Sequence, residues 1–482
     1  MVISMTSRPR STLTWILACV LVATLAEPSH ALEPGGRKTS DPLQAAKLAT
    51  QFLTEQVSTQ GGYLWKYSAD LSLKEGEGIV RTSTAWVQPP GTPTIGESFL
   101  NLYEATEDPQ FLDAARAVGQ ALLKGQMRSG GWQAMIEFDD DRRKKWAYVV
   151  DLPAKKRKDQ SSLDDDKTQS ATRFVIRLDR ALKMKDEAVH EMAMRALDGL
   201  ITKGQLRTGG FPQVWTDQRQ EPLDQPIRSA SYPDDWPREY PGHQQYWHRY
   251  TLNDNLAPDV LDTLFLAADV YQNKRYRDAA VRLADSLLLS QMPDPQPAWA
   301  QQYSFDMQPI WARKFEPPAI TAGESQGVIG ALMLVYQRTG DRKYLRPIPK
   351  ALDYLKRCEL PHGQLARFYE LKTNRPLYFT RDYQLSYDDA DVPTHYAFKV
   401  SSKIDRLRSQ YEKLAAQKSP KPTAPKQRRP SRAQLRSILM TQDERGAWVV
   451  DDRLRYHKVV GPIIDMKQTA ENLNALARHL AE

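Results

Sequence analysis

The stretch GQMRSGGW at residues 125–132 returns as GQLRTGGF at residues 204–211, and each copy follows a helical pattern. Apolar residues step by three and four positions along residues 112–122, which predicts an amphipathic helix. The same plan of helix, polar turn, helix and extended loop recurs twice more and ends at Trp299 and Tyr369. Repetition of a two-helix unit, with few strand signals, predicts stacked helical hairpins.

Two further helical pairs flank these repeats, one at residues 45–63 and one at residues 435–480. Six or so stacked pairs suit an (α/α) toroid, in which the Gly-rich loops converge on one face and frame a cleft. We therefore expect an all-α protein with an (α/α) toroid over residues 40–412. We expect a basic, Pro-rich linker to follow over residues 413–433. After it we expect a C-terminal helical pair over residues 434–482, which could close the toroid.

The first residues have the pattern of an export signal. Arg8 and Arg10 precede an apolar run over residues 13–25, and small residues follow it. This order predicts a signal peptide over residues 1–31 and a periplasmic or extracellular protein. Removing it leaves Cys358 as the one thiol, so we expect no intrachain disulfide. We expect a monomer that does not remain in the membrane after cleavage.

The formal net charge of +8 comes mostly from one segment. Residues 418–432 hold six basic side chains, four prolines and no acid, which is typical of an extended linker. The segment has no interleaved aromatic residues, and the chain is predicted to be exported. We therefore expect no nucleic-acid partner.

Two generic motifs in the sequence do not indicate a catalytic serine or a metal site. Residues 323–327 match the hydrolase pattern G-x-S-x-G, but a helical run follows them and no convincing strand precedes them. His243 and His248 are five positions apart without a companion cysteine, so polar loop histidines are favoured over a metal site.

Carboxylates gather at the start of two predicted helices, in Asp164-Asp165-Asp166 and around Asp254. One interpretation is helix capping with compensation of the helix dipole, which composition alone favours. The other is that the two helix starts jointly hold a hard cation such as calcium, which prefers oxygen ligands.

Arginines interleaved with aromatic residues form a third group in predicted loops. Its members are Arg313, Arg367, Arg375 and Arg381. Guanidinium groups suit bidentate recognition of carboxylates along an acidic chain. Surface ion pairing with Glu316, Glu370 and Asp382 is the alternative, and spacing does not decide between the two.

Taken together, the segments from about residue 110 to 403 resemble the family 10 polysaccharide lyases, the pectic acid lyases. The resemblance is carried, in the family's order, by GGWQAM (130–135), SLDDDKTQSATRF (162–174), GGFPQVW (209–215), YTLNDN (250–255), WARKFEPPAITAGES (311–325) and LARFYELKTNRPLYFTRD (365–382). It implies an (α/α) toroid that cleaves polygalacturonate by calcium-assisted β-elimination.

Position by position, the resemblance also implies roles. Asp164 and Asp254 correspond to the calcium-site acids, and Arg313 corresponds to the base that removes the C5 proton. Arg367 and Arg381 correspond to arginines that grip substrate carboxylates. A looser correspondence makes Lys403 a substrate-binding lysine.

The sequence departs from the family pattern at several positions. Asp165 and Asp166 add charge beside the expected calcium, and Phe211 replaces a tryptophan. A segment at residues 219–246, rich in Pro, Trp and Tyr, would overhang the cleft. Two rival functions remain: an acidic-polysaccharide-binding protein without turnover, and a glycoside hydrolase on the same toroid. The hydrolase would need an acid/base pair of carboxylates, for which the candidates are Glu316, Glu324 and Glu370.

Overall fold

The computed structural model describes residues 40–151, 156–417 and 428–481. The predicted signal peptide lies outside these residues, as do residues 418–427 of the predicted linker. The helices are α1 (Pro42–Phe52), α2 (Thr92–Thr106), α3 (Pro109–Gly125), α4 (Lys167–Ala181), α5 (Glu187–Gly199), α6 (Leu256–Tyr271), α7 (Lys274–Leu289), α8 (Ala322–Thr339), α9 (Ile348–Arg357), α10 (Ile404–Ala415), α11 (Arg432–Thr441) and α12 (Met466–Leu480). In the described part of the chain, no helix is both long and apolar enough to cross a bilayer.

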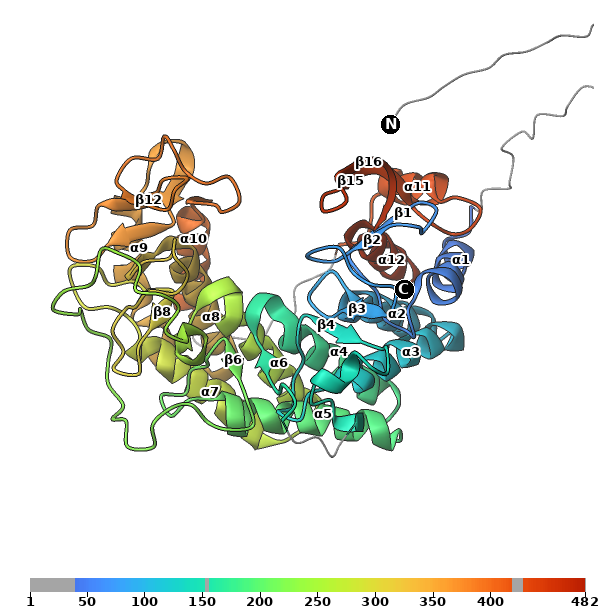
Figure 1. Ribbon diagram of the computed structural model, residues 1–482, viewed down its shortest axis with the longest axis horizontal. Helices are drawn as coiled ribbons and strands as arrows, with labels where there is room; N and C mark the ends of the chain where they lie inside the picture. Colours follow the sequence, from blue (N-terminus) through green and yellow to red (C-terminus); the bar gives the residue numbers. More distant parts are fainter. Residues whose placement is uncertain (1–39, 152–155, 418–427, 482) are drawn as a thin grey trace, which may run out of the picture. The chain divides into compact units, whose positions relative to one another are not determined.

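The even-numbered helices pack side by side in an inner row. Their contacts run in the order α12, α2, α4, α6, α8 and α10, and the middle of the row can be followed in Figure 1. The odd-numbered helices precede them in the chain and pack outside, as α1, α3 and α5 do. This two-layer arrangement of helical hairpins confirms the predicted (α/α) fold.

A repeated glutamine explains the repeated sequence GQxRxGG. Gln126 donates its side-chain amide to the carbonyl of Gly130 (2.8 Å) and to that of Met192 (2.9 Å) on the next outer helix. Gly130 has φ +112°, and a Cβ there would lie 2.7 Å from the carbonyl oxygen of Arg195, so only glycine fits. The equivalent glutamines of the other loops are Gln205, Gln291 and Gln442.

The last of these glutamines shows where the C-terminal pair lies. Gln442 donates to the carbonyl of Ala45 in α1 (2.9 Å), as Gln126 does to the next outer helix. In addition, α12 packs on α2, where the amide of Asn101 donates to Asn474 (2.8 Å). The pair α11–α12 therefore precedes α1–α2 in space, although it ends the sequence.

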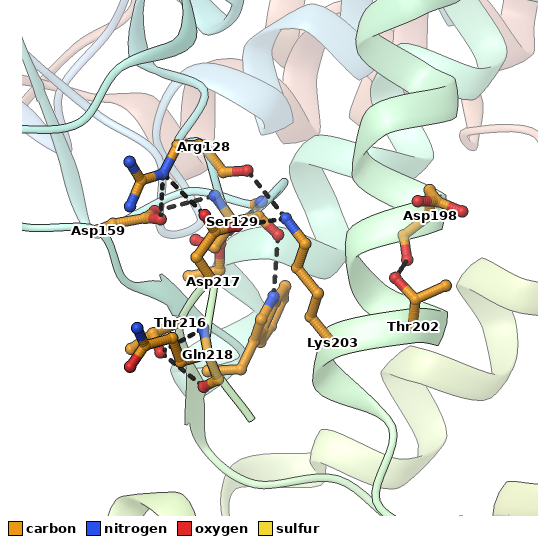
Figure 2. Close-up of polar contacts among 12 residues, drawn as sticks. Arg128, Ser129, Asp159, Asp198, Thr202, Lys203, Thr216, Asp217 and Gln218 are labelled. Carbon is orange, nitrogen blue, oxygen red and sulfur yellow. Dashed lines mark hydrogen bonds and ion pairs between the residues drawn. The ribbon is translucent and has the colours of Figure 1, made fainter. Parts of the chain in front are cut away.

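Polar contacts join neighbouring loops, as Figure 2 shows. Arg128 in the first Gly-Gly loop pairs with Asp159 (3.2 Å) and with Asp217 (2.9 Å) beyond the second loop. Lys203 pairs with Asp217 (2.5 Å) and donates to the carbonyl of Arg128 (3.3 Å). These contacts fix the two loops relative to each other at one end of the hairpins.

The loops contain more strands than the sequence indicated. Most are short: β1 (Lys66–Ser68), β2 (Lys74–Glu75), β3 (Thr84–Trp86), β4 (Met135–Glu137), β5 (Ser161–Ser162), β6 (Val214–Trp215), β7 (Tyr250–Thr251), β8 (Gln302–Tyr303), β9 (Ala319–Thr321), β10 (Gln364–Ala366), β11 (Phe368–Glu370), β12 (Pro376–Phe379), β13 (Leu385–Ser386) and β14 (Lys399–Ser401). The longest, β15 (Val449–Leu454) and β16 (Val459–Asp465), form a hairpin in a sheet of order β15-β16-β1-β2. This sheet ties the C-terminal pair to the N-terminal one, with Tyr67 opposite Ile464.

Candidate functional site

Two tight turns with the same backbone conformation precede α4 and α6. In the turn Asp164–Asp166, Asp165 has φ +47°, and in the turn Asn253–Asn255, Asp254 has φ +50°. Aspartate and asparagine are the non-glycine residues that adopt this left-handed region most readily. Because α4 and α6 pack against each other, the two turns are also in contact.

The turns bring three carboxylates together. Asp164, Asp165 and Asp254 each offer an oxygen, and these oxygens lie within 4.8 Å of one another. The N-cap positions of α4 and α6 are held by Asp166 and Asn255, so Asp164 and Asp254 are not capping residues. This geometry favours the cation-site interpretation over helix capping.

Polar side chains surround this acidic triad. Lys167 lies 2.5 Å from Asp164, and the Gln213 amide donates to the same carboxylate (2.5 Å). Gln88 donates to Asp165 (2.9 Å), and Asn253 donates to Asp254. Each acid is thus oriented by at least one neighbour.

The electrostatics of the triad show uncompensated negative charge. Burial, together with Asp165 and Asp164, raises the pKa of Asp254 to about 8. Burial and the charge of Asp164 also raise the pKa of Asp165. Burial alone would raise the pKa of Asp164, but Lys167 lowers it below its ordinary value. Carboxylates that disfavour one another's charge in this way gain stability from a shared cation.

The donor set fits a hard cation such as calcium. All three triad ligands are carboxylate oxygens, which calcium prefers. Two further buried oxygens around the triad, Oε1 of Gln88 and Oδ1 of Asn253, have no hydrogen-bond donor among the described residues. Buried acceptors without donors are uncommon, and a cation is one partner that satisfies them.

Arg313 lies beside the triad and is paired with Glu316. Its Nε and Nη2 atoms donate to the two oxygens of that carboxylate, at 2.8 and 2.5 Å. Burial alone would lower the pKa of the guanidinium, but the hydrogen bonds and charge of Glu316 raise it above its ordinary value. The charge of Arg313 also acts on Asp164 and Asp254. The ion pair with Glu316, which the sequence left as one of two alternatives, is present, but Glu316 is buried and the pair lies beside the acidic triad.

Arg367, like Arg313, lies near the acidic triad. Its Nε donates to the carbonyl of Ala397 (2.7 Å), and its guanidinium is 3.7 Å from Glu324. The Tyr396 ring packs between the two arginines, 4.6 Å from the Arg367 guanidinium and 5.5 Å from that of Arg313. The structure thus brings together Asp164, Asp254, Arg313 and Arg367.

The other predicted substrate-binding residues are engaged elsewhere. Arg381 pairs with Asp391 (3.2 Å), not with Asp382 as the ion-pair alternative supposed. Arg375 stacks on the ring of Tyr387 at 3.3 Å. Lys403 is exposed at the N-cap of α10.

Sequence reasoning missed several residues of the site. Asp165 had been treated as a departure from the family, yet it belongs to the acidic triad. Gln213 stands in the second Gly-Gly loop, and its position in the repeat could have identified it as a residue of the site. Gln88 and Tyr396 lie in segments without a repeat signature, and only tertiary contact identifies them.

Residues 126–334 match the sequence model of the pectic acid lyase family, whereas no curated protein matches the sequence. One similar solved structure is the family 10 polysaccharide lyase from Cellvibrio cellulosa. It is 18% identical, with 67% of this chain and 97% of that chain covered and a TM-score of 0.46. A variant of that lyase has been solved in complex with trigalacturonic acid.

A second similar structure is the GH76 α-mannanase of Bacteroides thetaiotaomicron. It is 11% identical, with 92% of this chain and 96% of that chain covered and a TM-score of 0.41.

The matched residues 126–334 include both turns of the acidic triad and Arg313. This match confirms, over residues 126–334, the resemblance read from the sequence, which is that of a polysaccharide lyase of the pectic acid lyase family.

Proposed function

We propose that the protein is an exported, calcium-dependent pectate lyase that cleaves polygalacturonate by β-elimination, with Arg313 as the base. The observation that carries the proposal is the meeting of three carboxylates with two arginines, Arg313 and Arg367, at one site.

An acidic polysaccharide suits this combination of charges. The guanidinium groups of Arg313 and Arg367 flank the Tyr396 ring and carry positive charge that a uronate carboxylate can bind. The triad would repel the same carboxylate unless a cation lies between them. An anionic chain therefore needs both the arginines and the calcium.

Asp164, Asp165 and Asp254 would hold the calcium through their carboxylate oxygens. When bound, calcium supplies positive charge that neutralises a substrate carboxylate and makes the adjacent C5–H bond more acidic. Gln213 and Gln88 keep two of the acids oriented through their amide hydrogen bonds.

Arg313 can take a proton only in its neutral form, because a guanidinium ion has no acceptor. In the ligand-free protein Glu316 favours the charged form. The positive charge of a calcium ion at the acidic triad would act in the opposite direction. The neutral guanidine then removes the C5 proton, the C5–H electron pair forms the C4–C5 double bond, and the C4–O4 bond breaks. Arg367 stabilises the charge that develops on the carboxylate.

The hydrolase alternative loses one of its three candidate acids, Glu316. Both oxygens of Glu316 accept hydrogen bonds from Arg313. Burial alone would raise the pKa of this carboxyl, but Arg313 lowers it below its ordinary value, so it has no proton to donate. A glycosidase needs one carboxylic acid that donates a proton to the leaving group.

The decisive experiment incubates the purified protein with polygalacturonate and calcium and follows the ultraviolet absorbance of the unsaturated product. We expect absorbance that a chelator abolishes. New reducing ends without absorbance would indicate a hydrolase, and binding without either product would indicate a binding protein.

Calcium binding is tested separately by calorimetry on two variants of one turn. Asp165→Asn removes a triad oxygen and should weaken calcium binding by about tenfold or more. Asp166→Asn is the matched control, because the Asp166 carboxylate pairs with Arg173 at 2.5 Å and is not in the triad. Equal affinities of the two variants would contradict the assignment of the site.

A further inference from the structure

Glu316 holds the Arg313 guanidinium along one edge only. It accepts from Nε–H through Oε2 (2.8 Å) and from Nη2–H through Oε1 (2.5 Å). The backbone N–H of Arg313 also donates to Oε2 (3.1 Å). Within the described residues, Nη1 is the one guanidinium nitrogen left without a hydrogen-bond partner. Meanwhile, the charge of the group acts on Asp164 and Asp254.

Glu316 is itself fixed in place. It is 2% exposed, and the Tyr396 hydroxyl donates to its Oε1 (2.9 Å). Gln301 also hydrogen-bonds its carboxylate. Its backbone N–H donates to the carbonyl of Arg313 (2.8 Å), which closes a tight turn between the two residues. A carboxylate held by this many contacts cannot rotate away from the arginine without losing several of them.

This arrangement restricts the neutral form of the arginine. A neutral guanidine has one imine nitrogen that can accept a proton, and that nitrogen can in principle be Nε, Nη1 or Nη2. A nitrogen that donates to a carboxylate must keep its proton. Nε has a single proton and donates it to Glu316, so Nε cannot become the imine nitrogen. Each terminal nitrogen carries two protons, and Nη2 can keep its hydrogen bond to Glu316 after losing the other proton, so the imine nitrogen is Nη1 or Nη2. An aspartate fixes the tautomer of a catalytic histidine by the same logic.

We propose that Glu316 is a positioning residue that keeps Nε of Arg313 protonated, so that the base is a terminal nitrogen of the guanidine. The proposal rests on the proposed function, in which Arg313 removes the C5 proton. One terminal nitrogen, Nη1 or Nη2, first gives one of its two protons to water. Its lone pair then forms a bond to the C5 proton, the C5–H electron pair forms the C4–C5 double bond, and the C4–O4 bond pair leaves with O4, which water protonates. Glu316 stays ionised throughout and keeps its two hydrogen bonds.

The test compares Glu316→Gln with Glu316→Asp. The glutamine side chain keeps the shape but has one acceptor oxygen and one amide donor, so it cannot accept from both Nε–H and Nη2–H. We expect kcat to fall by roughly 100-fold or more with little change in KM. Aspartate keeps two acceptor oxygens and should recover part of that loss. Glu221→Gln, another buried glutamate paired with an arginine (Arg219, 3.4 Å), is the control and should leave kcat unchanged.

A double-variant cycle separates positioning from a purely structural role. If Glu316 acts through Arg313, then Arg313→Ala and Arg313→Ala/Glu316→Gln have the same residual activity. A structural role would lower the activity of the double variant further. A readout independent of substrate is nitrogen NMR of the arginine side chains. The Nε–H of Arg313 should exchange slowly in the wild type and at least tenfold faster in Glu316→Gln.

Three results would overturn the inference: unchanged kcat in Glu316→Gln, additive losses in the double variant, or equal Nε–H exchange in both proteins. These results would leave the proposed function intact as long as the wild type produces the unsaturated product. A wild type that fails to form it would overturn the proposed function, and this inference with it.

Discussion

The ammonium group of Lys167 lies 2.5 Å from Oδ2 of Asp164, so one acid of the triad is already paired with a cationic side chain. Lys167 is buried, and it stands at the first position of α4. The lysine therefore stabilises the triad and, under the proposed function, would compete with calcium for one of its ligands.

Replacing Lys167 by an uncharged residue should increase the affinity of the acidic triad for calcium. We expect Lys167→Met to bind calcium roughly tenfold more tightly, because a unit positive charge next to a ligand opposes a second cation. The variant should also unfold at a lower temperature in a chelator, where three carboxylates are left together. Calorimetry and thermal melts with and without calcium check both effects. Lys203→Met, which removes an exposed ion pair, is the control. Weaker calcium binding in Lys167→Met would contradict this interpretation.

The two arginines named as substrate ligands should differ strongly in effect. Arg367→Ala should lower kcat/KM by about 100-fold, because the guanidinium lies at the acidic triad beside Tyr396. Arg381→Ala should lower it by less than about threefold, because this side chain is 69% exposed and pairs with Asp391. Steady-state kinetics on polygalacturonate measure both, and the opposite ranking would show that the substrate runs across the Arg381 loop.

Replacing Gly130, in the first Gly-Gly loop, should lower the stability of the fold strongly. Gly130→Ala should destabilise the protein by about 2–4 kcal/mol, because φ is +112° and the added Cβ meets the Arg195 carbonyl at 2.7 Å. Gly330→Ala is the matched control in the middle of α8, where nothing lies within 4 Å of the new Cβ. It should stabilise by about 0.5–1 kcal/mol. Denaturant unfolding measures both, and equal effects would exclude the close approach as the cause.

Stability should depend on pH through Asp259 in α6. Burial and the charge of Asp166 raise the pKa of Asp259 to about 7. The folded state therefore holds a proton that the unfolded state has already lost, and stability falls as pH rises from about 4 to about 7. Asp259→Asn removes this effect and should be more stable than the wild type at pH 8, by roughly 1–3 kcal/mol. At pH 4 the two proteins should unfold alike. A gap between them that does not grow with pH would contradict the assignment.

Periodicity and the repeated loops were sufficient to predict the helical hairpins. The sequence GQxRxGG could be recognised because each copy has a glycine at the same position of the loop, where the backbone has a positive φ. These glycines are Gly130 and Gly209. The hairpin β15–β16 was not predicted, although its two strands pair with each other locally. No local pattern could indicate the pairing of β16 with β1, which lies almost four hundred residues away in sequence.

The candidate site was also predicted only in part, because some of its residues are placed by tertiary contacts. Asp164, Asp254, Arg313 and Arg367 stand in segments with family signatures, and they meet at one site. Asp165 could not be assigned from its neighbours in sequence, because its direction is set by the left-handed turn. The partners of Arg381 could not be assigned either, because Asp391 lies in a loop whose path depends on tertiary packing.

The position of α12 on α2 has a consequence for how the chain folds. The hydrogen bond from Asn101 to Asn474 links residues 373 positions apart, so the first hairpin reaches its final packing only after the last helix has been synthesised. Contacts of such long sequence separation are slow to form. Until they form, the apolar residues of α2 that α12 covers stay open to unrelated chains. The beginning of this protein is therefore the part that needs shielding for longest during biosynthesis.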